Sequence, residues 1–477
     1  MLGGTGTRDV DLSIIIDVWL HSYETLSHFI IQLHGDALMD LELLSRIQFG
    51  ATISFHYLFP PLSIGLGLFL VIMEGTYLRT GNPIYHQMTR FWVKIFGLIF
   101  SLGVASGIVM EFQFGMNWST YSRFVGDVFG SALAAEGIFA FFLESGFLAI
   151  LLFGWDKVKP RTHFIATVCV ALGAHFSAIW IVVANSWQQT PAGHHIVEHL
   201  SGPRAEIVDF WQVVFNPSFL DRISHVYMGA WQSAAFLVLS VSAWYLLRNR
   251  HVEVAKAGMQ IAVFVALFSS VMQLVTGHGS ASTIAETQPA KLAAFEGHYH
   301  TAPAGLYILG WVDEGQETVT GIQLPGMLSF LVYGDATRSL TGLDAFPKNE
   351  RPPTNIVFQT YHLMVGVGFL LILISGLGFY SWKRGTLFTN RRLLWVLVFA
   401  VLLPQIANQL GWFSAEIGRQ PWIVYGLLKT ADAVSRSISV GHVAASLVTF
   451  GFVYLLLFVL FVYLLNEKIQ HGPDQIG

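Results

Sequence analysis

The sequence predicts an all-α polytopic membrane protein with nine transmembrane helices, an extracytoplasmic N-terminus and a cytoplasmic C-terminus. Three observations predict this class: 53% of the residues are hydrophobic, only 12% are charged, and the mean hydropathy is +0.56. Soluble domains carry about 25% charged residues, so this composition indicates that lipid is the main solvent. The net charge of −4 and the lack of a basic run argue against a nucleic-acid partner.

Each predicted helix must supply about 20 mostly apolar residues to cross a bilayer. The eighth is the weakest candidate, because Gln405 and Asn408 interrupt it. The sequence shows no internal repeat and no sign of helices broken near the middle of the membrane. The nine segments that qualify lie near residues 50–74, 91–112, 130–154, 163–187, 224–247, 256–276, 357–381, 391–412 and 442–466.

Basic residues in the short loops predict the orientation. Lysine and arginine cluster in the loops that follow the first, third, fifth and seventh spans, whereas the short loops on the opposite side hold more acidic residues. The basic loops are therefore expected in the cytoplasm.

The spans divide the chain into four segments. Residues 12–33 mix apolar residues with acidic ones, so the extension 1–38 is expected to hold an interfacial amphipathic helix. Residues 39–277 carry the first six spans, and 354–477 carry the last three. Between them, residues 278–353 form a long extracytoplasmic loop, and loops of this length are usually functional or disordered.

Three carboxyl groups fall within or at the end of the predicted spans. A charged group at the centre of a membrane helix costs about 2.5–3.5 kcal/mol, which makes each one a functional candidate. Glu136 and Glu144 lie about 12 Å apart along the third span and about 80° apart around it. Glu111 ends the second span. Each alone could be a neutral structural group, but the three together favour a proton path, an iron ligand or an ion site.

Histidines and a methionine within the spans could bind heme. His56, His225 and Met364 are each unremarkable alone, because such side chains usually serve in packing or hydrogen bonding. A histidine–methionine pair makes a low-spin heme, whereas one strong ligand leaves a position open for oxygen. His163 and His175 are twelve residues apart on one span, about 120° around the helix. A structural role is favoured for both.

Two outer segments carry charged residues beside aromatic ones. Glu416 and Arg419 lie in GWFSAEIGRQPW, which suits membrane anchoring or the binding of heme propionates. Lys291 and Glu296 lie in QPAKLAAFEGHYH of the long loop, where they could also be a solvated helix face. If this segment is helical, they point about 140° apart and meet different groups.

Together these segments resemble subunit I of the cytochrome bd-type quinol oxidases, over roughly Leu41 to Leu465. The motifs that carry the resemblance are LSRIQFGATISFH, FWVKIFG, MEFQFGMNWS, EGIFAFFLES, FGWD, VANSWQQ, KLAAFE and GWFSAEIGRQPW. The resemblance implies a multi-pass oxidoreductase of the bacterial inner membrane. Such an enzyme oxidises quinol on the extracytoplasmic side, passes electrons through three hemes and reduces oxygen to water. It generates a proton motive force without a pump.

The resemblance also implies the cofactors and their ligands. The family holds a low-spin heme b, a high-spin heme b and a heme d. His225 and Met364 match the ligands of the low-spin heme. His56 and Glu136 match the ligands of the other two irons, one each, and which of them holds heme d stays open.

Further residues match functional positions of the family. Glu144 matches a carboxylate on the proton route, and Trp412 matches a residue that lies between hemes. Glu111, Glu416 and Arg419 match residues near the high-spin hemes or their propionates. The positions that match the quinol-binding segment are Lys291 and Glu296.

The sequence departs from the family pattern at two places. Some members have an arginine where this chain has His362, and the long loop resembles that of the short-loop branch. That branch includes cyanide-insensitive oxidases in which heme b replaces heme d. The resemblance therefore implies that the third heme is heme d or a further heme b. Family chains usually begin near Met39, so residues 1–38 are an added interfacial helix or a misassigned start.

The resemblance implies partners and excludes other classes. The expected partners are subunit II, a small single-span subunit, ubiquinol or menaquinol, oxygen and lipid. A proton-coupled transporter that uses the three glutamates would show repeats and broken helices. A heme-copper oxidase would need a histidine cluster with a His-Pro-Glu segment, which the sequence lacks.

Overall fold

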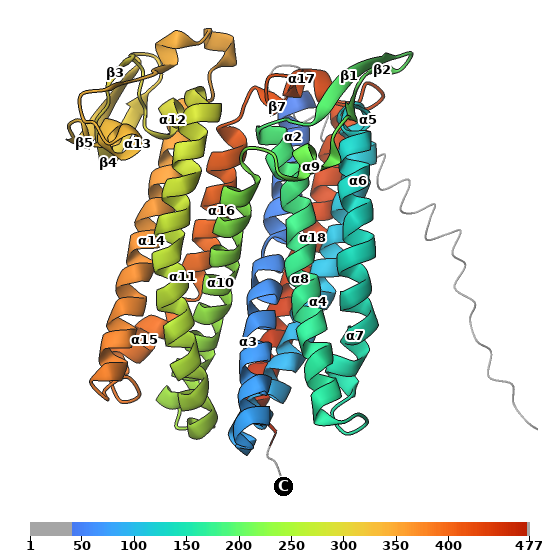
Figure 1. Cartoon of the computed structure of the whole chain (residues 1–477), viewed down its shortest axis with the longest axis vertical. Coiled ribbons are helices and arrows are strands. Elements are labelled where there is room, and N and C mark those ends of the chain that lie inside the picture. The colour runs from blue at the N-terminus through green and yellow to red at the C-terminus, as the bar shows by residue number, and fades with distance from the viewer. Residues whose placement is uncertain (1–40, 475–477) are drawn as a thin grey trace, which may run out of the picture.

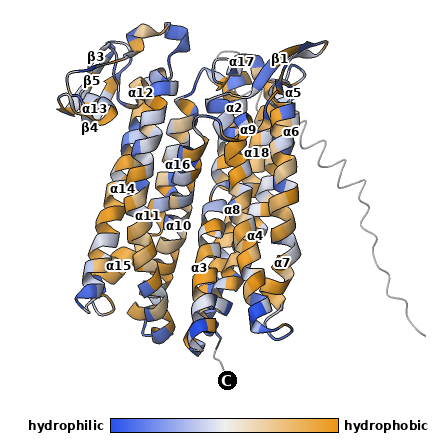
Figure 2. Ribbon diagram, viewed as in Figure 1, coloured by the Kyte–Doolittle hydropathy of each residue, from blue (hydrophilic) through white to orange (hydrophobic). Residues whose placement is uncertain are grey.

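The computed structural model describes residues 41–474 and shows an upright bundle of long helices with small sheets at one end (Figure 1). Nine helical segments between these residues are long and apolar enough to cross a membrane, as the sequence predicts. Figure 2 shows apolar residues along the helices and hydrophilic residues concentrated at their ends. The proposed interfacial helix and the start at Met39 lie outside the described residues.

The first four spans pack around one another. The first span packs against the second and fourth, and the third packs against the same two neighbours, so the first and third spans lie opposite each other. The elements are α2 (Leu41–His56), α3 (Pro60–Thr80), α4 (Pro83–Met116), α6 (Gly126–Glu136), the π-helical turn η1 (Gly137–Phe141), α7 (Phe142–Phe153) and α8 (Pro160–Gln189).

The fifth to eighth spans repeat this arrangement. α11 and the eighth span each pack against both α10 and α14, so α10 and α14 lie opposite each other. α3 and α10 join the two units through a large apolar core, and the last helix, α18, packs against α2 and α4. The elements are α10 (Phe219–Leu247), α11 (Val252–Thr287), α14 (Thr354–Lys383), α15 (Arg391–Phe399), α16 (Leu402–Ile417) and α18 (Val440–His471).

Three spans are interrupted, so the expectation of unbroken helices was wrong. The first breaks after His56, directly before Pro60 and Pro61, because proline lacks the N–H that would continue the ladder. The eighth breaks between Phe399 and Leu402, shortly before Pro404. The third contains the π-helical turn, and such turns are frequent at functional sites. Two of the three interruptions directly follow a predicted iron ligand.

The end of the bundle that carries the long loop also carries all the strands. Every sheet is a two-stranded antiparallel pair: β1–β2, β3–β6, β4–β5 and β7–β8. α11 continues to Thr287, beyond the predicted end of the sixth span at 276, because a helix can extend past the hydrocarbon region where hydropathy falls. The remaining elements are α5 (Ser119–Phe124), β1 (His194–His199), β2 (Gly202–Ile207), α9 (Phe210–Val214), α12 (Pro289–Phe295), β3 (Ala302–Pro303), β4 (Leu306–Asp313), β5 (Thr318–Leu324), α13 (Met327–Tyr333), β6 (Ser339–Leu340), η2 (Leu343–Ala345), η3 (Lys348–Glu350), β7 (Trp422–Val424), β8 (Leu428–Lys429) and α17 (Thr430–Ala433).

Candidate functional site

His225 lies near the start of α10 and is oriented by the neighbouring helix α11. The Thr276 hydroxyl donates to the carbonyl oxygen of Met272 at 3.0 Å, so its oxygen accepts from Nδ1 of His225, also at 3.0 Å. The imidazole therefore carries its proton on Nδ1 and its lone pair on Nε2. Nε2 accepts a hydrogen bond from the Gln273 amide at 3.1 Å. A metal that binds Nε2 would take the place of this amide.

His56 ends α2 and has the same arrangement with α4. The Ser106 hydroxyl donates to the carbonyl oxygen of Leu102 at 2.8 Å and lies 2.9 Å from Nδ1 of His56. Nε2 of His56 makes no hydrogen bond to any residue between 41 and 474. Both histidines thus offer a free or replaceable Nε2 lone pair, with Nδ1 held by a hydroxyl group. Iron-ligating histidines are commonly held in this way.

A glycine follows each of these hydroxyl residues and leaves space beside the imidazole. A Cβ atom added at Gly107 would lie 3.3 Å from Cε1 of His56, and one added at Gly277 would lie 3.3 Å from Cε1 of His225. Any larger residue would therefore press on the ring. The two sites share a histidine on one helix and a hydroxyl–glycine pair on the next.

Met364 lies on α14, opposite His225 across the second four-helix unit. A Cβ added at Gly411 of α16 would lie 3.0 Å from its sulfur atom, so a glycine again keeps the space beside a predicted ligand. Side chains on facing helices of a bundle are the usual means of holding a cofactor in its interior. The residues therefore fit a heme with histidine and methionine ligands.

Glu136 and Glu144 both face α8, although the π-helical turn separates them. The Ser177 hydroxyl donates to the Glu136 carboxylate at 2.6 Å, and a Cβ added at Gly173 would clash with the Glu144 side chain. The two carboxyl groups therefore face the same neighbouring helix. Glu111 is exposed on α4. Since His56 and Glu136 lie on opposite spans of the first unit, each can present one strong ligand to an iron.

Glu416, at the end of α16, is the centre of a polar network. Its carboxylate lies 2.6 Å from the Arg419 guanidinium and 3.8 Å from that of Arg222. The side-chain amides of Asn185 and Gln189 each donate to it at 3.1 Å. Two guanidinium groups thus face one carboxylate, and the excess positive charge suits further anions such as propionates.

Trp412 lies one turn before Glu416 and joins this network to α2. Its ring packs edge to face on Tyr57 with the centroids 5.3 Å apart, and the Arg222 guanidinium lies 5.8 Å from its centre. Tyr57 directly follows His56, and Arg222 lies one turn before His225. The tryptophan therefore connects the surroundings of the two histidines.

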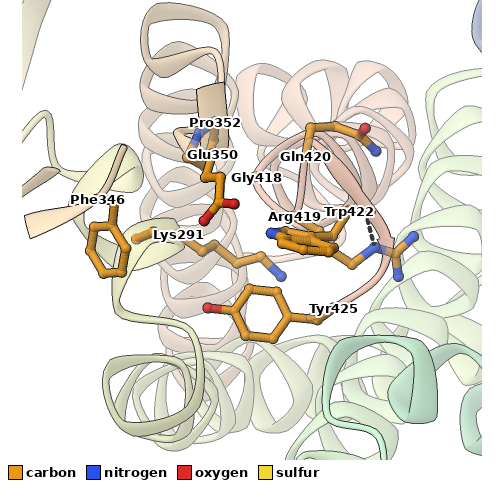
Figure 3. A pocket seen from close by; sticks show the side chains of 10 residues that line it. Lys291, Phe346, Glu350, Pro352, Gly418, Arg419, Gln420, Trp422 and Tyr425 are labelled. Carbon is orange, nitrogen blue, oxygen red and sulfur yellow. Dashed lines mark hydrogen bonds between the residues drawn. The ribbon is translucent and has the colours of Figure 1, made fainter. Parts of the chain in front are cut away.

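Lys291 of α12 is buried and joins the same network through Gln189, whose side-chain oxygen accepts from its ammonium group. Burial lowers the pKa of Lys291 well below the usual lysine value, and the nearby arginines lower it further. The side chain also lines a cavity of about 40 Å³ (Figure 3). Its other walls include Phe346, Glu350, Trp422 and Tyr425.

Glu296 follows α12 and points toward His362 of α14 rather than toward Gln189. Burial raises the pKa of its carboxyl group to about 8. Oε2 has no hydrogen-bond partner among the described residues, and Nε2 of His362 lies 3.9 Å away. The expectation that Lys291 and Glu296 meet different groups is confirmed. Lys291 faces Gln189, and both Lys291 and Glu296 are buried, so the alternative of a solvated helix face is wrong.

His163 and His175 have structural partners, as predicted. Nδ1 of His163 donates to Glu74 at 2.7 Å, and the pair is buried between α3 and α8. His175 donates to the carbonyl oxygen of Ala171 and accepts from Trp231. In residues 41–474 no three histidine, cysteine or acidic side chains gather to bind a bare metal ion.

Sequence reasoning missed the residues that support the candidate ligands. Arg222 is one of these residues, and its position one turn before His225 was a usable signal. Asn185 and Gln189 lie in VANSWQQ, a motif that carried the resemblance without an assigned role. Nothing in the sequence pairs Ser106 or Thr276 with a histidine, because the contacts join different helices.

The chain is similar to known proteins over most of its length. Residues 44–473 match the family of cytochrome bd terminal oxidase subunit I. The chain belongs to this family. It is 36% identical over 444 residues to cytochrome bd ubiquinol oxidase subunit 1 of Bacillus subtilis (strain 168), which covers 91% of this chain and 94% of the relative. It is 34% identical over 499 residues to cytochrome bd-II ubiquinol oxidase subunit 1 of Escherichia coli (strain K12). That match covers 90% of this chain and 96% of the relative.

A solved bd oxidase structure shares the fold. The structure from Geobacillus thermodenitrificans superposes with a TM-score of 0.85 at 29% identity and covers 91% of this chain and 99% of that one. This subunit I is thus a membrane-integral oxidoreductase of respiratory electron transport, and its family binds heme. Family membership excludes both the transporter and the heme-copper oxidase.

Proposed function

We propose that this subunit I oxidises quinol at the end of the bundle that carries the long loop and delivers the electrons to oxygen. The observation that carries the proposal is the presence of two ligand sets in two four-helix units. One unit holds His225 opposite Met364, and the other holds His56 opposite Glu136. When bound, three hemes would supply one-electron transfer and, where a position is open, oxygen binding.

The proposed ligand roles follow from the donor atoms. Nε2 of His225 and the sulfur of Met364 hold a low-spin heme b. Nε2 of His56 and the Glu136 carboxylate each hold one of the other two hemes, a high-spin heme b and either heme d or a further heme b. Arg222 and Arg419 would bind propionates, and Trp412 would lie between the surroundings of His56 and His225.

Glu296 is the proposed proton acceptor for quinol. Its unpartnered Oε2 can accept the hydrogen bond of a ring hydroxyl, and a carboxyl group with a pKa of about 8 is well matched to general-base work near neutral pH. Lys291 orients the opposite polar edge of the ring from its side of α12. The substrate is ubiquinol or menaquinol, and the relatives from B. subtilis and E. coli cited above are named as ubiquinol oxidases.

Glu144 is proposed to pass protons toward Glu136 for the reduction of oxygen to water. It lies on the cytoplasmic side of Glu136 if the basic loops face the cytoplasm, and both face α8. Glu111 is a further proton-carrying candidate. Protons released by quinol outside and consumed from inside separate charge without a pump.

The proposed topology places the N-terminus outside and the C-terminus inside. The basic loops after α3, α7, α10 and α14 lie at the end of the bundle opposite the long loop, where α18 also ends (Figure 1). There, Lys94 forms an ion pair with Asp474 at 2.6 Å. The proposed assembly also contains subunit II and a small single-span subunit.

Oxygen uptake by the purified complex tests the proposal. Addition of a soluble ubiquinol or menaquinol should start oxygen consumption, with about one oxygen reduced per two quinols from electron balance. The Glu296→Gln complex is the matched control and should keep all heme bands but lose the activity. A native complex that contains heme but gives no quinol-dependent oxygen uptake would contradict the proposal.

A further inference from the structure

The hairpin of β4 and β5 in the long loop has two apolar faces. On its inner face, Val312 and Val319 pack against Phe358 of α14. Side chains alternate along a strand, so the residues next to these valines in each strand point away from the protein. The register pairs Leu309 with Ile322 on that outer face.

The outer face is exposed and almost entirely apolar. Leu309 and Trp311 are each 64% exposed and Ile322 is 62% exposed, and only Thr320 is polar on this stretch of the face. A hairpin with one face in water normally carries polar residues on that face. Exposed apolar patches of this kind mark interaction sites.

Hydrogen bonds to α14 fix the depth of the hairpin. Gln359 donates to the carbonyl oxygen of Gly310 at 2.9 Å. Nε2 of His362 lies 3.0 Å from the carbonyl oxygen of Tyr307. From His362 to Lys383, at the other end of the same helix, the distance is about 30 Å at 1.5 Å per residue. That distance equals the thickness of the hydrocarbon core of a bilayer. The hairpin therefore lies beside the boundary between acyl chains and headgroups.

The apolar surface continues onto neighbouring elements at this level. On α14, Ile356 and Leu363 are exposed, as expected of residues that face lipid. α13 shares a small core with β4 and exposes Phe330 and Leu331. The charged residues of the hairpin instead gather at its tip, between Asp313 and Glu317.

We propose that the outer face of this hairpin lies in lipid, at the interface of the leaflet on this side of the bundle. Trp311 then occupies the headgroup level, where tryptophan is enriched, while Leu309 and Ile322 reach the upper acyl chains. The acidic tip remains in water. The inference concerns only the hairpin and its surface, so it stands whether or not Glu296 binds quinol.

Spin labels at single cysteines test the proposal in the purified complex, reconstituted in phospholipid nanodiscs. Cys169→Ser removes the only native cysteine. Labels are then attached at Leu309→Cys and, separately, Ile322→Cys. Gln316→Cys at the tip is the water control, and Leu373→Cys on α14 is the lipid control. Relaxation by oxygen, which partitions into lipid, is compared with relaxation by a water-soluble nickel chelate.

Each pattern of accessibility identifies one occupant. The proposal predicts high oxygen and low nickel accessibility at residues 309 and 322, as at 373, and the reverse at 316. High nickel accessibility at 309 and 322 would show that the face lies in water. Low accessibility to both reagents would show that another protein covers it. Either result overturns the proposal, and two independent label sites guard against a local distortion by one substitution.

Discussion

Nδ1 of His225 lies 3.0 Å from the hydroxyl oxygen of Thr276. This hydroxyl group donates its hydrogen to the carbonyl oxygen of Met272, one turn earlier on the same helix. His56 and Ser106 repeat this relationship in the other four-helix unit. In both places the hydroxyl can only accept, so the imidazole must present the lone pair of Nε2. Each candidate histidine ligand is thus held in its binding tautomer by a residue on the next span.

Replacement of Thr276 by valine should raise the midpoint potential of the low-spin heme. The hydrogen bond makes the imidazole a stronger electron donor, which favours oxidised iron. A bond worth about 0.5–1.5 kcal/mol corresponds to about 20–60 mV for one electron. Redox titration of the heme band measures the shift, and Thr276→Ser is the control that keeps the hydroxyl. An unchanged potential in the valine variant would show that the contact does not act on the heme.

The rate of quinol oxidation should rise with pH through about 8. The Glu296 carboxyl group has a pKa of about 8, so below that pH it is protonated and cannot act as a base. Above it, the carboxylate accepts the quinol proton. The pH profile of kcat/KM should show this ascending limb in the native complex. Glu296→Gln should abolish the limb and lower the rate by about 10²–10⁴. A limb that survives in the glutamine variant would assign the base elsewhere.

Replacement of Lys291 by alanine should impair quinol oxidation but spare the hemes. The side chain lines the cavity beside Trp422, and its contact with Gln189 lies away from the candidate ligands. We expect a higher KM for quinol, unchanged heme bands and normal oxygen binding by the chemically reduced complex. If Lys291→Ala and Glu296→Gln both retained turnover with an unaltered KM, quinol would have to bind at another place.

Replacement of Arg222 by alanine should loosen the network around Glu416. The guanidinium donates to Asn185 at 2.5 Å and lies 3.8 Å from the carboxylate. Loss of hydrogen bonds to charged groups should lower the free energy of unfolding by about 1.5–3 kcal/mol. Thermal unfolding of the complex, with heme content measured in parallel, checks this. Arg222→Lys should lower the free energy of unfolding by less. Equal stability of the alanine and native complexes would show that the network does not stabilise the protein.

Hydropathy alone predicted the nine helices, because lipid imposes a continuous apolar stretch on each span. It could not predict where they break or extend. Pro60 and Pro61 indicate a break in the first span. No proline marks the π-helical turn between Glu136 and Glu144, so the sequence gives no comparable signal there. The end of α11 at Thr287 was missed because its last turns are polar.

The candidate site was predictable only through the family motifs. A lone His56 or Met364 carries no ligand signal, since both residue types are common in helix packing. The contacts that give them meaning, such as Ser106 with His56 and Gly411 with Met364, join distant segments. The repeated helix arrangement likewise appears only in space, because the two units share little more than a histidine and a hydroxyl–glycine pair on the following span.

The spectrum of a Met364→Leu complex tests whether His225 and Met364 hold one heme together. Met259→Leu, a buried methionine on α11, is the matched control. Reduced-minus-oxidised spectra and redox titration follow the hemes separately. We expect Met364→Leu to remove or strongly shift the low-spin heme signal and to leave the high-spin hemes in place, while the control changes nothing. A low-spin signal of unchanged position and potential in Met364→Leu would contradict the pairing of His225 with Met364.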